Sequence, residues 1–198
     1  MNIKVSPMGP YQTNCYIVTT NGTDIIIDPG ANAVSWVLKN ITKPVAILNT
    51  HGHFDHVWSN QELKELLDIP LYTPKKDVFL LQSSSWAPNL PPSYPDVEVE
   101  GDCQFDLEGV QIRFRHFPGH SPGCSTIEIE DAMFSGDFIF KNSIGRVDFP
   151  YSNPQQMKDS LKKFADITYD KAVYPGHGEQ TSIKQEQLNT PYWIKQIG

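Results

Sequence analysis

The sequence contains only three cysteines, Cys15, Cys103 and Cys124, and none of them forms a C-x-x-C pair. An odd number of cysteines cannot all pair within one chain, and many structural zinc sites and redox motifs use the C-x-x-C spacing. A disulfide framework of the kind found in small secreted proteins is therefore excluded. We expect reduced thiols and a cytoplasmic location.

Long apolar runs and an excess of basic residues are also missing. No apolar run approaches the ~20 residues that cross a membrane, and residues 1–7 hold no apolar segment long enough for a secretory signal. The chain has 16 Lys and Arg against 23 Asp and Glu, which gives a net charge of −7. Nucleic acids and anionic membranes are poor partners for such a chain. We expect a small-molecule substrate, and leave open whether the protein is a monomer or a dimer.

Apolar residues make up 39% of the 198 residues, which is enough for a sizeable core. At a soft average of ~150 residues per domain, we expect one domain over residues 1–198. Strand-like segments come first, and helices and strands then alternate in both halves of the chain, which predicts a layered α/β domain. Strands are predicted at 3–6, 14–20, 24–28, 45–49, 111–116, 125–130, 132–135 and 171–174.

A capping pattern predicts a helix after position 59. Ser59 followed by Glu62 is a capping-box spacing, in which each side chain bonds the backbone at the other residue. We expect the helix that it opens to bury Leu63, Leu66 and Leu67.

Proline marks two further features. Asn153 before Pro154 is a favourable N-cap and first-turn pair for a helix, and another helix is expected over 182–188. The segment 83–97 is rich in proline and has no periodicity, so we expect a long loop there.

Five of the six histidines stand in loops directly after strand-like segments. Strand ends at one edge of a sheet are where α/β proteins bind ligands. Imidazole is a good ligand for zinc, iron or nickel, and a carboxylate can bridge two cations. Two aspartates accompany the histidines, so the set suffices for two ions. The candidate ligands are His51, His53, Asp55, His56, His120, Asp137 and His177.

The alternative is that these histidines are structural. A single histidine at a strand end is usually a satisfied surface or core residue. The run from His51 to His56 differs, because three imidazoles and a carboxylate within six residues are hard to satisfy in an interior without a metal. His116 has no neighbouring Gly or Pro, and we interpret it as a strand residue or as a group that supports a ligand.

The histidines belong to four longer motifs, Thr50-His51-Gly52-His53-Phe54-Asp55-His56, Pro118-Gly119-His120-Ser121-Pro122-Gly123, Phe134-Ser135-Gly136-Asp137 and Pro175-Gly176-His177-Gly178. In this order they resemble the metal-binding motifs of the metallo-β-lactamase superfamily, and Asp28-Pro29-Gly30 resembles its early strand-end motif. Within the superfamily the chain is most similar to short glyoxalase II-like hydrolases. The resemblance implies a four-layer αββα sandwich, without the separate C-terminal domain that binds glutathione in full-length glyoxalase II.

The resemblance also implies a ligand set for two divalent ions, with zinc expected first and iron or manganese as alternatives. His51, His53 and His120 would hold one ion. Asp55, His56 and His177 would hold the second, and Asp137 would bridge them. An Asp at 137 in place of a Cys speaks against the main zinc β-lactamase subgroup. Asp55 would also orient the hydroxide that bridges the ions, which gives it a catalytic role.

Three functions follow from this set. The first is hydrolysis of a thioester such as S-(hydroxyacyl)glutathione, because a thiolate leaves without a strong general acid. The second is a persulfide dioxygenase with one Fe(II), although Gly178 stands where those relatives carry an Asp. The third is a metal-binding protein without turnover, which the intact ligand set disfavours.

Four further residues are candidates for substrate binding. Arg146 replaces a glutathione-binding Lys of the family and could clamp a carboxylate, or else form a structural ion pair with Asp148. Lys141 is more weakly placed. Trp86 and Tyr94 lie in the 83–97 loop, which is either a lid over the substrate or a surface loop with incidental aromatic residues.

Overall fold

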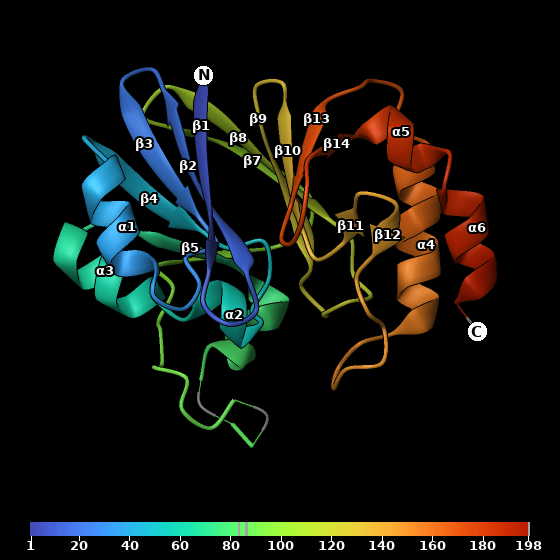
Figure 1. Ribbon diagram of the computed structural model, residues 1–198, viewed down its shortest axis with the longest axis horizontal. Helices are drawn as coiled ribbons and strands as arrows, with labels where there is room; N and C mark the ends of the chain where they lie inside the picture. The colour runs from blue at the N-terminus through green and yellow to red at the C-terminus, as the bar shows by residue number, and fades with distance from the viewer. Residues whose placement is uncertain (83, 86, 198) are drawn as a thin grey trace.

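A computed structural model describes residues 1–82, 84–85 and 87–197 of the chain (Figure 1). Within these residues, two six-stranded sheets face each other and helices lie on their outer sides. The predicted αββα sandwich is confirmed. The first sheet has the order β1 (Asn2–Met8), β2 (Thr13–Thr20), β3 (Thr23–Ile27), β4 (Pro44–Leu48), β5 (Leu71–Pro74) and β6 (Val97–Val99). The second has the order β14 (Thr181–Ser182), β13 (Ala172–Pro175), β10 (Ala132–Gly136), β9 (Ser125–Ile129), β8 (Val110–His116) and β7 (Cys103–Leu107).

Apolar residues of both sheets meet in a core between them. Ile25 and Ile27 of β3 point inward, together with Phe114 of β8 and Phe134 of β10. The side chain between them, Ile26, points to the opposite face. Both faces of β3 are therefore buried, which explains why its sequence is a continuous apolar run rather than an alternation.

The first sheet is covered on its outside by α1 (Ala33–Asn40) and α3 (Asn60–Leu67), on the left in Figure 1. Leu63 packs into this outer layer, whereas Leu66 is 58% exposed. The prediction that Leu66 is buried was therefore wrong. The predicted capping bond is also not formed, because the Ser59 hydroxyl donates to the Gly30 carbonyl instead, at 2.7 Å.

The second sheet is covered by α4 (Pro154–Ala165), α5 (Ile183–Gln187) and α6 (Thr190–Gln196), on the right in Figure 1. The Asn153 side chain accepts a hydrogen bond from the Gln156 amide at 3.0 Å, so the predicted N-cap of α4 is confirmed. The helix expected over 182–188 is α5. Sequence reasoning missed α6.

The strand directions bring the loops of both sheets to one edge of the sandwich. β3, β4 and β5 run parallel to one another, and β10 runs parallel to β13. Their carboxyl ends open on the side that carries the short helix α2 (Phe54–Val57), at the bottom of Figure 1. Two smaller elements lie at the same side, the 3₁₀ helix η1 (Lys75–Leu81) and the hairpin of β11 (Ile139–Phe140) and β12 (Ser143–Ile144).

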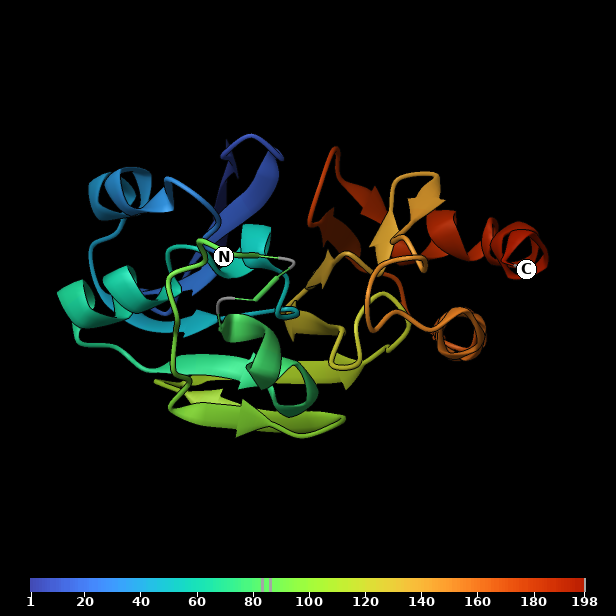
Figure 2. The ribbon, with the colours of Figure 1, turned by 90° about the horizontal axis from the view of Figure 1, so that it is seen from below.

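Figure 2 views the molecule from below, onto this edge. The described part of the segment between η1 and β6 crosses the face that carries α2. That part has neither helix nor strand before β6, as expected for a long loop. Among the described residues, no helix has the length and apolar character needed to cross a membrane.

The N-cap of α4 gives a first test of the fold. Replacing Asn153 with Ala removes the acceptor for the Gln156 amide, and we expect a loss of about 1 kcal/mol in the free energy of unfolding. Urea unfolding of the chelated protein measures this. Gln155→Ala, in the exposed first turn of the same helix, is the control and should change stability by less than about 0.5 kcal/mol. Equal effects of the two changes would mean that the cap contributes nothing.

Candidate metal centre

Histidine and aspartate side chains from separate loops converge where the strands end. Among the described residues, three groups of three ligating atoms can be formed, and the atoms of each group lie within 4.8 Å of one another. One consists of Asp28, His51 and His56, which connects the other two. Of those two, the first group consists of His51, His53 and His120, and the second of Asp55, His56 and His177. The structure therefore brings together both sets of residues that the sequence singled out.

Asp137 lies between the two groups. Its Oδ2 is 3.4 Å from His120 Nε2 of the first group and 3.5 Å from His177 Nε2 of the second. Its Oδ1 is 3.3 Å from His56 Nε2. A Cβ added at Gly176 would collide with Asp137 Oδ1. The Pro-Gly-His motif thus needs its glycine so that the loop can approach this carboxylate closely.

Hydrogen bonds at Nδ1 orient four of the imidazoles. Each Nδ1 faces an oxygen on the outer side of the site, which directs Nε2 toward the centre. The distances are 3.1 Å from His51 to Thr50 Oγ1, 3.0 Å from His56 to Asp28 Oδ2, 2.8 Å from His120 to the Arg146 carbonyl and 3.1 Å from His177 to the Tyr11 carbonyl.

The inward-facing atoms fit a cation. Within the described part of the chain, Nε2 of His51, His56 and His120 and Oδ1 of Asp137 are buried without a hydrogen-bond partner. A buried polar atom without a partner is costly, and imidazole nitrogen with carboxylate oxygen is a donor set that binds zinc and iron. The His and Asp groups therefore imply divalent metal ions.

The protonation states of the two groups differ. Burial and the neighbouring imidazoles lower the pKa of His51 well below its usual value and that of His53 to about 3. Burial opposes protonation of His177 as well, but Asp137 and Asp55 raise its pKa to about 9. His51 and His53 are therefore neutral imidazoles, which is the form that binds metal, whereas His177 of the second group is protonated beside the two carboxylates.

Comparisons with known proteins agree with this geometry. The model of the metallo-beta-lactamase superfamily matches residues 8–177. The chain belongs to the metallo-beta-lactamase superfamily. The hydroxyacylglutathione hydrolase GloC of Haemophilus influenzae is 32% identical, over 97% of this chain and 98% of its own.

Two solved structures of similar length share the superfamily fold at comparable identity. BLEG-1, a B3 metallo-beta-lactamase, superposes with a TM-score of 0.87 at 29% identity, over 97% of this chain and 99% of the other. TTHA1623 in a di-iron-bound form gives 0.82 at 33% identity, over 96% and 99%. The metals bound by superfamily folds of this size thus include iron.

Asp55, the predicted catalytic residue, is held by a residue that sequence reasoning missed. The Thr13 hydroxyl, at the start of β2, donates to Asp55 Oδ2 at 2.7 Å. His56 and His177 lower the pKa of Asp55 to about 2 against the effect of burial. The carboxylate is therefore ionised at neutral pH and fixed in orientation.

An open pocket with a volume of about 270 Å³ lies over the centre. Its walls are aromatic, and Arg146 lies at its rim. The Arg146 guanidinium stacks over the Phe149 ring at 4.4 Å and forms a two-bond pair with Asp148, at 2.9 and 2.7 Å. Both earlier interpretations of Arg146 thus have a basis, because the ion pair exists and the side chain borders the pocket. The described residues lining the pocket are Tyr11, His53, Phe54, Asp55, His120, Asp137, Phe140, Arg146, Phe149 and His177.

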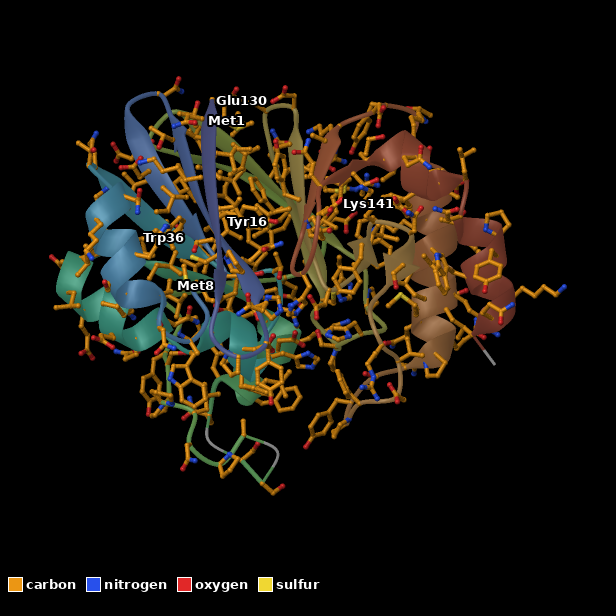
Figure 3. All side chains as sticks on the ribbon, in the orientation of Figure 1. Met1, Met8, Tyr16, Trp36, Glu130 and Lys141 are labelled. Atoms are coloured by element: carbon orange, nitrogen blue, oxygen red, sulfur yellow. The ribbon has the colours of Figure 1, made fainter. Side chains whose placement is uncertain are left out.

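The other candidate substrate residues do not converge on this pocket. Lys141 pairs with Glu179 at 2.6 Å in the half of the molecule opposite β1 (Figure 3). Tyr94 is 59% exposed, and its backbone bonds Gln61 and Lys64 of α3. These contacts hold Tyr94 against the outer helix layer, which disagrees with a role over the metals. Trp86 lies outside the described residues.

Asp77 supports the first metal group and was also missed. This carboxylate of η1 is fully buried and accepts bonds from the Gly52 amide at 2.9 Å, the Ser121 hydroxyl at 2.6 Å and the Gly123 amide at 2.5 Å. It thereby joins the loop of His51 and His53 to the loop of His120. Nothing in the local sequence distinguishes it from an exposed aspartate.

Asp77→Asn tests this linkage. An amide offers only one acceptor oxygen, so at least one of the three donors loses its partner, and we expect a loss of about 1–3 kcal/mol in the free energy of unfolding. Metal bound per chain should also fall. The matched change is Asp106→Asn on the exposed face of β7, whose carboxylate accepts a hydrogen bond from the Gly109 amide. Unchanged stability and metal content in Asp77→Asn would show that the carboxylate does not organise the site.

Cys124 and His116 both lie outside the two ligand groups, and His116 is a strand residue, as interpreted from the sequence. Cys124 is fully buried in the apolar layer beneath α4, and His116 ends β8 with its Nε2 2.8 Å from the Pro122 carbonyl. We expect Cys124→Ser to keep the full metal content, measured by elemental analysis of purified protein. Loss of one equivalent would identify the thiol as a ligand.

Proposed function

We propose that the protein is a dinuclear metallohydrolase that cleaves thioesters, of which S-(hydroxyacyl)glutathione is the first candidate. The observation that carries the proposal is the pair of His and Asp groups that share Asp137 at the floor of an open pocket. The similarity to the hydroxyacylglutathione hydrolase GloC supports the substrate class.

His51, His53 and His120 would hold one ion, and Asp55, His56 and His177 the other, with Asp137 between them. We propose zinc as the resident metal, with iron as the alternative that the di-iron form of TTHA1623 supports. Two divalent ions supply Lewis acidity at a carbonyl oxygen and lower the pKa of bound water toward neutrality.

The chain's own side chains position the reactants. The Asp55 carboxylate accepts a proton or a hydrogen bond from the attacking water, and its bond from Thr13 keeps one oxygen committed to that geometry. The aromatic walls exclude water from the thioester and hold it over the ligands. No general acid is needed for the leaving group, because a thiol of pKa ~8.5 departs readily as its anion.

Arg146 fits a carboxylate of the thiol carrier. Its guanidinium is 65% exposed, lies flat on Phe149 at the rim and is already oriented by Asp148. A planar guanidinium can bind an incoming carboxylate through two hydrogen bonds. The carrier would therefore lie on the side of the pocket formed by the second sheet and the β11–β12 hairpin.

Two other activities need to be separated from thioester hydrolysis. The likeness to BLEG-1 makes β-lactam hydrolysis a second candidate, and a persulfide dioxygenase would use one Fe(II) and consume oxygen. The deciding experiment measures metal per chain in protein purified without added metal. It then compares turnover of S-lactoylglutathione, a cephalosporin and glutathione persulfide, with oxygen uptake recorded. Two metals per chain with thioester turnover support the proposal, whereas one iron with oxygen uptake contradicts it.

Removing a ligand of the second ion tests the two-ion arrangement. Asp55→Ala and His177→Ala should each lower kcat for the thioester by about 10²-fold or more, with the fold intact and the first ion partly retained. Asp159→Ala, an exposed carboxylate on α4, is the control. Wild-type turnover of either variant under limiting metal would contradict a dinuclear mechanism.

A further inference from the structure

A second and larger cavity lies beside the metal pocket. Its volume is about 420 Å³, within the usual range of small-molecule sites. Tyr11, Phe54 and Asp55 line both spaces. The Tyr11 and Phe54 rings meet edge to face at 5.2 Å and form the partition between them. The cavity therefore adjoins the candidate centre across a shared wall.

The walls of the second cavity come from the first half of the chain. Met8, labelled in Figure 3, and Pro10 belong to β1 and the turn that follows it. Ala31 precedes α1, Trp58 ends α2, and Pro88 comes from the described part of the loop before β6. Seven of the twelve described lining residues have apolar side chains, and Asn32 and Asn89 add uncharged polar groups, so the cavity offers contacts chiefly to a neutral hydrocarbon group.

The two cavities differ in the charged residues that line them. Among the described residues that line the second cavity, Asp55 is the only charged one, and no Lys or Arg is among them. A carboxylate or phosphate placed there would have no Lys or Arg to pair with. The metal pocket differs, because Arg146 is among its lining residues and does not line the second cavity. The anionic part of a substrate therefore belongs near Arg146, and the neutral part belongs in the second cavity.

We propose that the cavity bounded by Met8, Ala31, Phe54 and Trp58 is the subsite for an apolar acyl chain. The inference rests on the proposed thioester hydrolysis and extends its substrates to thioesters of medium-length alkyl or aryl acids. The carbonyl carbon lies over the ligand groups, the thiol carrier extends toward Arg146, and the acyl chain passes the Tyr11–Phe54 partition. Small hydroxyacyl groups leave this space unfilled.

The chain-length dependence of the wild-type enzyme is the primary test. Thioesters of the small neutral thiol N-acetylcysteamine, with acetyl, butanoyl, hexanoyl and octanoyl groups, keep the leaving group constant. We expect kcat/KM to rise by about three- to fourfold for each methylene buried, the factor that corresponds to ~0.8 kcal/mol. A second series with an acetyl group and alkyl thiols of increasing length should show a smaller rise. A steeper rise in the second series would overturn the assignment of the cavity to the acyl side.

Two variants change the cavity in opposite directions. Ala31→Leu adds volume to the wall and should lower the ratio of kcat/KM for octanoyl to acetyl thioester by at least about tenfold, the loss of about two buried methylenes. Trp58→Leu removes volume and should move the optimum to a longer chain. Leu66→Ala, on the exposed face of α3, is the control and should leave the ratio unchanged. Opposite shifts are the decisive readout, because general destabilisation would not move the ratio both ways.

Binding without turnover gives an independent measurement. The indole N–H signal of Trp58, assigned by comparison with Trp58→Leu, should shift when octanamide is added to metal-free protein. Octanoate should bind at least about tenfold more weakly, because no Lys or Arg among the described lining residues can pair with its charge. Equal binding of the two ligands, or no shift with either, would overturn the neutral subsite.

The outcomes distinguish the two proposals. If no thioester of either series is hydrolysed, the proposed function fails. If thioesters are hydrolysed but S-lactoylglutathione and acetyl thioesters exceed every longer acyl group, thioester hydrolysis stands and the acyl subsite is wrong.

Discussion

The contact between β2 and the loop after β13 is the constraint on which the candidate centre depends. The Asn14 amide donates to the Gly176 carbonyl at 2.7 Å, and the Tyr16 hydroxyl donates to the Pro175 carbonyl at 2.6 Å. The Asn14 side chain adds two bonds of 3.0 Å to the same loop. These bonds join the two sheets directly beside the site. Together with the bond between His177 Nδ1 and the Tyr11 carbonyl, they fix His177 relative to the ligands that the first sheet supplies.

Buried carboxylates also hold together the loops that form the candidate centre. Asp28, Asp77 and Asp137 are all buried, and a buried charge is tolerated only where donors or cations surround it. Asp28 meets this condition by accepting bonds from the Thr50 amide and hydroxyl and from His56. Asp77 does so with loop amides and a hydroxyl. Asp137 differs because one of its oxygens has no donor. Asp28 and Asp77 therefore hold the loops of the site together, whereas Asp137 faces the position at which a cation would bind.

The sequence predicted the parts of the fold and site that depend on local pattern. The eight predicted strands, the α4 cap at Asn153 and the placement of the histidines at strand ends follow from alternation, capping chemistry and loop position. The strands β5, β6, β7 and β14 and the β11–β12 hairpin were missed. Asn189, Thr190 and Pro191 repeat the polar–proline pattern of Asn153 and Pro154, so α6 could have been recognised by the same rule.

Features that depend on contacts between distant segments could not be predicted in this way. Leu66 and Leu67 are adjacent in α3, and only the sheet beneath them decides which one turns inward. Asp77 becomes a structural carboxylate because the loops at Gly52 and Gly123 close over it, 25 and 46 residues away. Lys141 does not line the pocket, and its ammonium group pairs with Glu179, 38 residues further along the chain. No local signal encodes any of these partners.

The turn between β1 and β2 contacts both cavities and also bonds two residues of the candidate centre, His177 and Asp55. Tyr11 separates the two cavities with its ring and orients His177 with its carbonyl, and two residues later Thr13 holds Asp55. Gly9 and Gln12 both adopt positive φ, at 61° and 56°, and the Gln12 amide closes the turn onto the Gly9 carbonyl at 3.3 Å. A group in the larger cavity that contacts the Tyr11 ring would therefore contact the same turn whose backbone bonds His177 and whose Thr13 side chain bonds Asp55.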